Sequence, residues 1–110
     1  MPWFITAICS KETMERIAEQ AKNPKYTPLR NHTFGFYNSY NEAYEAVSQN
    51  RGSMCECLYD YIVLEYIECG IHPMVHAEEW FVWDQHNRMW NYIGVNRPKE
   101  FDFVCNWALG

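Results

Sequence analysis

The stretch Leu58-Tyr-Asp-Tyr-Ile-Val-Leu-Glu-Tyr-Ile-Glu68 decides the fold. It is rich in Tyr, Ile and Val, the aromatic and β-branched residues that suit a pleated strand. In an extended chain Tyr61 and Val63 point to one face. The alternate residues Ile62 and Leu64 point to the other face, so both faces are apolar. A strand of this kind is typical of the centre of a sheet. We therefore predict a central strand over residues 58–68.

Further strands are predicted on both sides of this one. Strand-like runs with aromatic and β-branched residues cover 3–9, 33–37, 79–83 and 89–93. The polar residues 84–88 separate the last two runs and predict a hairpin. Residues 101–109 contain Phe, Val, Cys and Trp, which favours a final edge strand, with a short helix as the alternative.

Two helices are expected between the early strands. Ser39 and Glu42 have the spacing of a capping box, in which the hydroxyl and the carboxylate each bond a backbone amide of the first turn. The helix that follows covers about 41–50 and ends where Asn50 or Gly52 can adopt a left-handed conformation. A shorter helix over about 11–22 starts after Ser10.

This order of elements predicts an α+β fold. We expect a five- or six-stranded, mainly antiparallel sheet, with the main helix (about 41–50) and the short helix (about 11–22) packed on it. The 110 residues match the size of one domain, so we expect a single domain over 1–110. Residues 10–29 are interpreted as an insertion between the first two strands.

The aromatic content exceeds what these helices can cover. Each helix shields a strip ~10 Å wide, so two short helices protect about one face of such a sheet. The excess lies in 58–68 and in the hairpin 79–93, where large apolar side chains point to both faces. A curled sheet, a second subunit or a flat ligand could cover the other face. This surplus predicts a homo-oligomer.

Charge and cysteine content exclude several classes of protein. The net charge of −5, with nine Lys and Arg, is unsuited to coating duplex DNA or anionic lipid, whereas a small anionic ligand needs only a few cations. No apolar run approaches the ~18–20 residues that span a bilayer. Five cysteines cannot all pair within the chain, and no leader-like segment precedes the first strand. We expect reduced thiols and a cytoplasmic protein of a bacterial host.

The candidate metal ligands are widely spaced. Cys55 and Cys57 are followed by Cys69, His72 and His76. Structural zinc sites usually pair ligands separated by two to four residues, and one intervening residue in a strand places two side chains on opposite faces. We therefore favour reduced thiols over a metal site, and we expect no cofactor.

Catalytic signatures are not evident in the sequence. It has no glycine-rich phosphate loop, GxSxG elbow or HExxH motif. The carboxylate pairs Glu78–Glu79 and Glu65–Glu68 are interpreted as solvated surface. An enzyme remains an alternative, with His72 and His76 as its candidate side chains.

Residues suited to ligand binding are concentrated in turns and at the ends of elements. Arginine forks match phosphate geometry and aromatic rings stack on bases. The predicted ligand-binding residues are Arg30, His32, Tyr37, Tyr40, Arg88, Trp90 and Arg97, and Arg51 occupies a similar turn.

The chain resembles a group of small uncharacterised phage, prophage and gut-bacterial proteins. The matching segments are Trp3 to Thr6, Thr33 to Tyr37, Glu42 to Asn50, Tyr59 to Glu65, Gly70-Ile71, Trp80 to Trp83, Pro98 and Asn106 to Gly110. The resemblance carries no activity and transfers no site residue. It implies a non-enzymatic binding protein, directed against host defence, that sequesters a nucleotide-type immune signal or binds a host protein. The alternatives are a small enzyme acting on such a nucleotide and a protein–protein interaction module without a small ligand.

Overall fold

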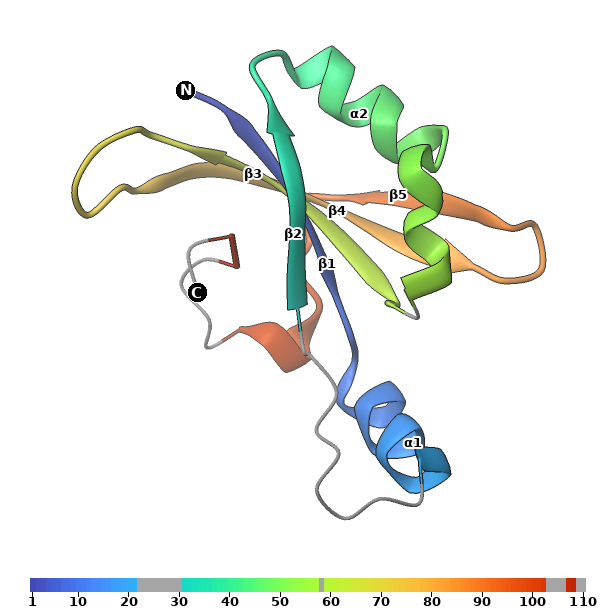
Figure 1. Ribbon diagram of the computed structural model, residues 1–110. Helices are drawn as coiled ribbons and strands as arrows, with labels where there is room; N and C mark the ends of the chain where they lie inside the picture. Colours follow the sequence, from blue (N-terminus) through green and yellow to red (C-terminus); the bar gives the residue numbers. More distant parts are fainter. Residues whose placement is uncertain (22–30, 58, 103–106, 109–110) are drawn as a thin grey trace.

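A five-stranded antiparallel sheet forms the centre of the protein (Figure 1). The structure is a computed structural model that describes residues 1–21, 31–57, 59–102 and 107–108, with the side chains of 21 and 55–57 left out of the description. The strand order is β2-β1-β3-β4-β5, and every neighbouring pair is antiparallel. The strands are β1 (Trp3–Ile8), β2 (Asn31–Tyr37), β3 (Tyr61–Ile67), β4 (Val75–Asp84) and β5 (Met89–Gly94). The predicted α+β class is confirmed.

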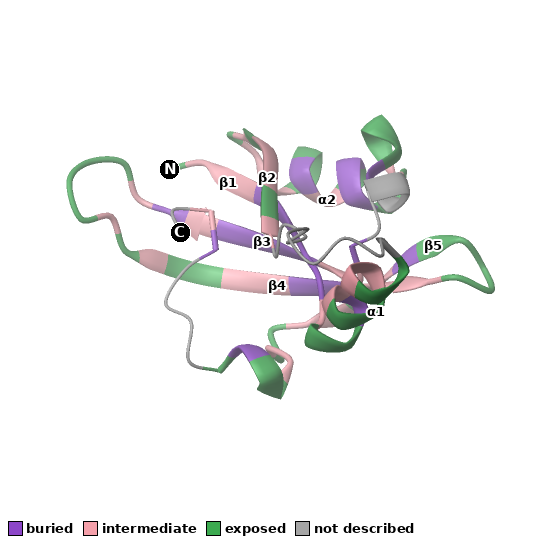
Figure 2. Cartoon of the chain, turned by 60° about the horizontal axis from the view of Figure 1, so that its bottom comes forward, coloured by how far each residue is buried: buried purple, intermediate pink, exposed green. Residues whose placement is uncertain are grey.

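Strand β3 lies in the middle of this sheet, as its sequence predicts. Its consecutive residues Ile62, Val63 and Leu64 are all completely buried although they point to alternate faces. Figure 2 shows the buried residues running along β3 and the central part of β4. The sheet therefore has an apolar core on each side, and each side needs a cover.

Helix α2 (Tyr40–Ser48) covers one side, which we call the α2 face. Its stripe of Ala43, Ala46 and Val47 is buried against the sheet, because these positions repeat at helical spacing. The helix ends as expected, with positive φ at Asn50 (49°) and Gly52 (69°). Ser39 is the N-cap residue, but its side chain makes no capping hydrogen bond, so the prediction of a capping box is wrong.

Helix α1 (Lys11–Ala21), predicted over about 11–22, lies beyond the end of β1 (Figure 1) and packs against the core of the sheet through Met14. The Ser10 hydroxyl accepts a hydrogen bond from the Thr13 amide (3.1 Å), which caps the helix. The Asp60 carboxylate fixes this end, accepting from the Ser10 amide (2.7 Å) and the Thr13 hydroxyl (2.9 Å). Of the predicted insertion 10–29, α1 occupies the first part, and 22–29 lie outside the described residues.

The chain's own C-terminal segment covers the opposite side of the sheet, which we call the C-terminal face. Trp80 on β4 stacks on Phe101 (5.7 Å between ring centroids, 7° between planes), and Phe101 meets Trp107 edge-on (5.1 Å). Phe101 ends the 3₁₀ helix η2 (Lys99–Phe101). The strand predicted over 101–109 is not present in its described residues 101–102 and 107–108; the rest of it lies outside the described residues.

Glu65 anchors this C-terminal cover. Its carboxylate accepts the backbone amides of Trp107 (2.9 Å) and Ala108 (2.8 Å), and its side chain is completely buried. Burial raises the pKa of the Glu65 carboxyl although both amide hydrogen bonds lower it. The interpretation of Glu65 as a solvated residue is therefore wrong. A glutamate in an otherwise apolar strand is needed here because an irregular segment presents backbone amides that require acceptors.

The two covers together account for most of the aromatic surplus. Trp80 is buried beneath the C-terminal cover, and Phe81 and Trp90 are buried on the α2 face, so that all three are between 0% and 3% exposed within a single chain. The homo-oligomer therefore stays a prediction and no longer rests on these rings. None of the helices in the described part of the chain is long and apolar enough to cross a membrane.

Candidate ligand-binding pocket

A pocket of about 450 Å³ opens between β2, the end of α2 and the 3₁₀ helix η1 (Arg51–Cys57). We call it the β2–α2 pocket. A volume of this size lies within the ~300–1,000 Å³ that small-molecule sites usually occupy. Its lining residues are Ile5, Phe34, Gly35, Phe36, Tyr37, Ala46, Arg51, Gly52 and Met54.

Gly35 keeps the floor of the pocket open. It pairs with Ile5 beside an irregularity in the β1–β2 register, so that this position faces α2. A Cβ added at Gly35 would meet no atom within 4 Å, which shows that the space over this backbone is unfilled. A ligand could therefore approach the main chain of β2 closely at this point.

Aromatic rings and one arginine define the chemistry of the pocket. Phe34 is held edge-on against Tyr59 (6.4 Å, 85°), and Tyr37, the last residue of β2, also lines the pocket. The Arg51 guanidinium is exposed, with its Nε donating to the Gln49 side chain (3.2 Å) and a loose ion pair to Glu45 (3.8 Å). Aromatic rings and a planar cation, the groups that bind bases and phosphates, therefore line one pocket.

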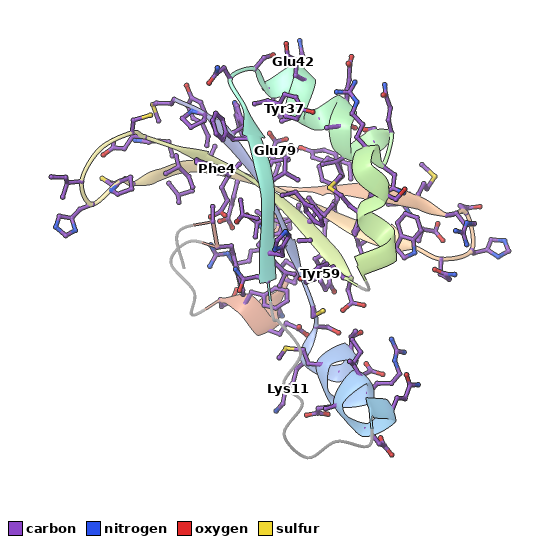
Figure 3. All side chains as sticks on the ribbon, in the orientation of Figure 1. Phe4, Lys11, Tyr37, Glu42, Tyr59 and Glu79 are labelled. Carbon is purple, nitrogen blue, oxygen red and sulfur yellow. The ribbon has the colours of Figure 1, made fainter. Side chains whose placement is uncertain are left out.

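Part of the predicted ligand-binding set lies at this side of the sheet. Tyr37 lines the pocket and lies close to the start of α2 (Figure 3). His32 is exposed on β2 and meets the Phe34 ring edge-on (4.9 Å, 83°). Tyr40 begins α2, but its hydroxyl is engaged with Glu79 (2.9 Å). Arg30 lies outside the described residues.

The other predicted residues are placed elsewhere. Arg88 is exposed in the β4–β5 turn with φ of 53°. Trp90 is 3% exposed and donates its ring N–H to the Asn50 side chain (3.1 Å), so its faces belong to the core. Arg97 lies on the C-terminal face, where its Nε and a terminal nitrogen bond both oxygens of Glu78 (2.7 and 2.6 Å). The structure does not bring these three residues to the pocket.

The metal candidates lie on or near the β3–β4 connection. Cys69 and His72 are exposed, and His76 pairs with Glu68 (2.9 Å). The side chains of Cys55 and Cys57 are not among those described. Within the described residues, no three His, Cys, Asp or Glu side chains are grouped so that they could hold a metal ion.

A second, smaller pocket of about 210 Å³ separates α1 from the start of β3 and the β4–β5 hairpin. Two of its lining groups are engaged within the fold: Asp60 holds the start of α1, and the Trp83 ring N–H donates to Gln85 (2.7 Å). The β2–α2 pocket has about twice the volume, and we take it as the candidate site.

Sequence reasoning missed Gly35 and Phe34 as site residues and left Arg51 outside the predicted set. A signal was present, because a glycine inside a strand often marks a point where another group approaches the backbone. Arg51 lies in the helix-ending Asn-Arg-Gly turn, but its proximity to β2 depends on how α2 packs, which one sequence does not specify.

Comparisons with protein-family models, curated proteins and solved structures gave no match to this chain. The fold and the site therefore rest on the geometry above, and the resemblance to phage proteins stays a prediction.

Proposed function

We propose that the protein is a small non-enzymatic binding protein that sequesters a nucleotide-type signal in the β2–α2 pocket. The observation that carries the proposal is the combination, in one open pocket, of Phe34 and Tyr37 rings with the Arg51 guanidinium. Rings hold a base by stacking on its face, and a guanidinium holds a phosphate by charge-assisted hydrogen bonds. The phage resemblance supports action against host defence in the bacterial cytosol.

Size and charge narrow the ligand that this pocket would take. Arg51 is the one basic residue among the described residues of the lining, so the ligand would carry one phosphate group at this position. The exposed Glu45 lies 3.8 Å from Arg51 and would repel further negative charge. A monophosphate or a cyclic monophosphate therefore suits the pocket better than a triphosphate.

The test is a thermal-shift and calorimetric titration with nucleoside monophosphates, cyclic nucleotides and triphosphates. A bound ligand raises the free energy of unfolding by about 2.7 kcal/mol at a hundredfold excess over Kd. We expect Arg51→Gln to weaken binding by about tenfold or more, since a charge-assisted hydrogen bond contributes about 1.5–3 kcal/mol. Arg88→Gln is the matched control, because Arg88 is an exposed arginine in a distant turn.

Three results would overturn the proposal. Failure of every nucleotide to bind would remove it, and so would equal losses in the Arg51 and Arg88 variants. A product that accumulates during incubation would replace sequestration by the enzymatic alternative.

The second candidate, binding to a host protein, is favoured by the β3–β4 connection. Ile71 is 90% exposed and Met74 is 62% exposed, and large apolar side chains in this state often mark protein contacts. Ile71→Asp with Met74→Asp should abolish binding to a host partner and leave nucleotide binding unchanged. Retention of the partner by this double variant would exclude the connection as the contact.

A further inference from the structure

Two tyrosines converge on the Glu79 carboxylate at the α2 face. The Tyr40 hydroxyl on α2 and the Tyr92 hydroxyl on β5 donate to the same oxygen, Oε1, at 2.9 and 2.5 Å. Burial, followed by the hydrogen bond to Glu79, raises the pKa of Tyr40, and the hydrogen bond to Glu79 is the main cause that raises the pKa of Tyr92. Both phenols therefore stay protonated and donate to the Glu79 side chain.

The two tyrosines that bond this carboxylate belong to a cluster of aromatic rings. Tyr44 lies 5.9 Å from Tyr40 and 5.7 Å from Tyr92, measured between ring centroids. Trp3 on β1 packs against Tyr40 at 5.1 Å. The faces of such rings carry negative electrostatic potential and attract cations, so a cation bound at Glu79 would lie beside this cluster.

The site is open at the side where β5 ends. Pairing between β4 and β5 stops at Trp80 and Gly94, one residue before Glu79. Tyr92 is 46% exposed, and Ala77, two residues from Glu79 on the same side of β4, is exposed. Glu79 itself is partly exposed, and Glu42 on α2 is exposed. A small group could therefore reach the carboxylate from solvent.

No cation within the described chain neutralises Glu79. Its second oxygen, Oε2, accepts no hydrogen bond from the residues that the structure describes. The adjacent Glu78, on the other face of the same strand, has both oxygens bonded by Arg97. The two neighbouring glutamates thus differ in their partners. Glu78 is bonded by an arginine, and Glu79 is bonded by two tyrosine hydroxyls.

We propose that Glu79, with the rings of Tyr40, Tyr44 and Tyr92, binds the ammonium group of a small organic cation. The free carboxylate oxygen supplies the opposite charge, and the ring faces supply the cation–π attraction that characterises ammonium sites. This site is separate from the β2–α2 pocket and does not depend on the nucleotide proposal.

The test is a calorimetric and NMR titration of the full chain with choline and with its uncharged isostere 3,3-dimethylbutanol. We expect choline to saturate the site and the isostere to bind at least about tenfold more weakly, because the two differ in charge and not in shape. Glu79→Gln should weaken choline binding by about tenfold and keep an oxygen for the two phenols. Glu42→Gln, at an exposed acid on the same helix as Tyr40, should leave choline binding unchanged.

Several outcomes would overturn the proposal. If the isostere binds as tightly as choline, the binding is due to apolar contact and not to charge. If choline affinity falls equally in the Glu42 and Glu79 variants, the binding is due to the overall surface charge. If neither choline nor a second ammonium probe, butylammonium, saturates a site on the protein, Glu79 is a structural contact only. If Glu79→Gln fails to fold, Tyr92→Leu removes an exposed ring and keeps the carboxylate, and undiminished choline binding in that variant contradicts the role of the ring.

Discussion

The two faces of the sheet are covered by different means. On the α2 face a regular helix buries Ala43, Ala46 and Val47, and its backbone hydrogen bonds are satisfied within the helix. On the C-terminal face an irregular segment buries Phe101 and Trp107, and its backbone amides depend on the sheet for acceptors. The difference explains why a buried glutamate is found on the second face and not beneath the helix.

The polar groups on the two faces also have different roles. Glu65 and the Glu78–Arg97 pair hold the irregular cover in place on the C-terminal face. On the α2 face, Arg51 and Glu79 are only partly engaged and border open space. The face covered by a helix therefore has polar groups left for ligands, and both proposed sites lie there.

The largest expected effect is at the aromatic stack of the C-terminal face. Trp80→Ala removes a completely buried ring that stacks on Phe101, and such truncations cost about 3–5 kcal/mol. Trp83→Ala, at a partly buried tryptophan on the α2 face, should cost clearly less. Urea denaturation measures the free energy of unfolding of both variants. Equal losses would show that the stack of Trp80 on Phe101 contributes no more than a partly buried ring does.

Breaking the Glu78–Arg97 pair should have the next largest effect. Arg97→Met leaves a mostly buried carboxylate without its bidentate partner, and we expect a loss of about 2–3 kcal/mol at pH 7. Arg88→Met, at an exposed arginine, should be nearly neutral. Equal losses in the two variants would show that the ion pair is not what stabilises the fold.

The same pair predicts a pH dependence. Burial alone would raise the pKa of the Glu78 carboxyl, but the hydrogen bonds and charge of Arg97, with the Trp80 hydrogen bond, lower it below its ordinary value. A carboxyl with a lowered folded-state pKa stabilises the fold above its unfolded pKa of about 4.3, and that stabilisation is lost as pH falls through the folded value. The difference between the native chain and Arg97→Met should therefore shrink below about pH 4. A constant difference down to low pH would contradict the assignment.

A smaller effect is expected when Glu65 is changed to Gln. The variant offers one carbonyl oxygen to two backbone amides, which loses a hydrogen bond, but it also removes the burial of a charge. We expect a net loss of about 1 kcal/mol, with faster hydrogen exchange at the amides of Trp107 and Ala108. Unchanged exchange at both amides would argue against the anchoring role.

The smallest effect is predicted on the α2 face. Tyr40→Phe removes one donor to Glu79 but leaves the ring against Trp3 and the hydrogen bond from Tyr92. The expected loss in the free energy of unfolding is about 0.5–1 kcal/mol. A loss of unfolding free energy as large as that of Arg97→Met would mean that a polar contact also contributes strongly to the stability of the α2 face.

Much of the fold was predictable from local patterns. The double-sided apolar run at 58–68 identified the central strand, and the turn at 84–88 identified the hairpin. Helix boundaries followed from Ser10 and from the left-handed positions Asn50 and Gly52. These features depend on neighbours in the sequence, which is why a single chain displays them.

The cover of the second face and most of the site were not predictable. Phe101 and Trp107 had strand-like composition, but their partners Trp80 and Glu65 lie far away in the sequence. A glutamate at position 65 has the same local pattern whether it is solvated or buried. The pocket likewise depends on where η1 packs beside β2, and this contact joins distant segments.

The strand order also has a consequence for how the chain folds. The β3–β4 and β4–β5 hairpins join neighbouring segments, whereas β1 pairs with β3 across α1, β2 and α2. Closing a long loop costs more chain entropy than closing a hairpin, so non-local pairings form late. We expect the amides of β4 and β5 to gain protection before those of β1 in pulsed hydrogen exchange during refolding. Simultaneous protection of all strands would show that the sheet forms in one cooperative step, with the central pairing as part of the nucleus.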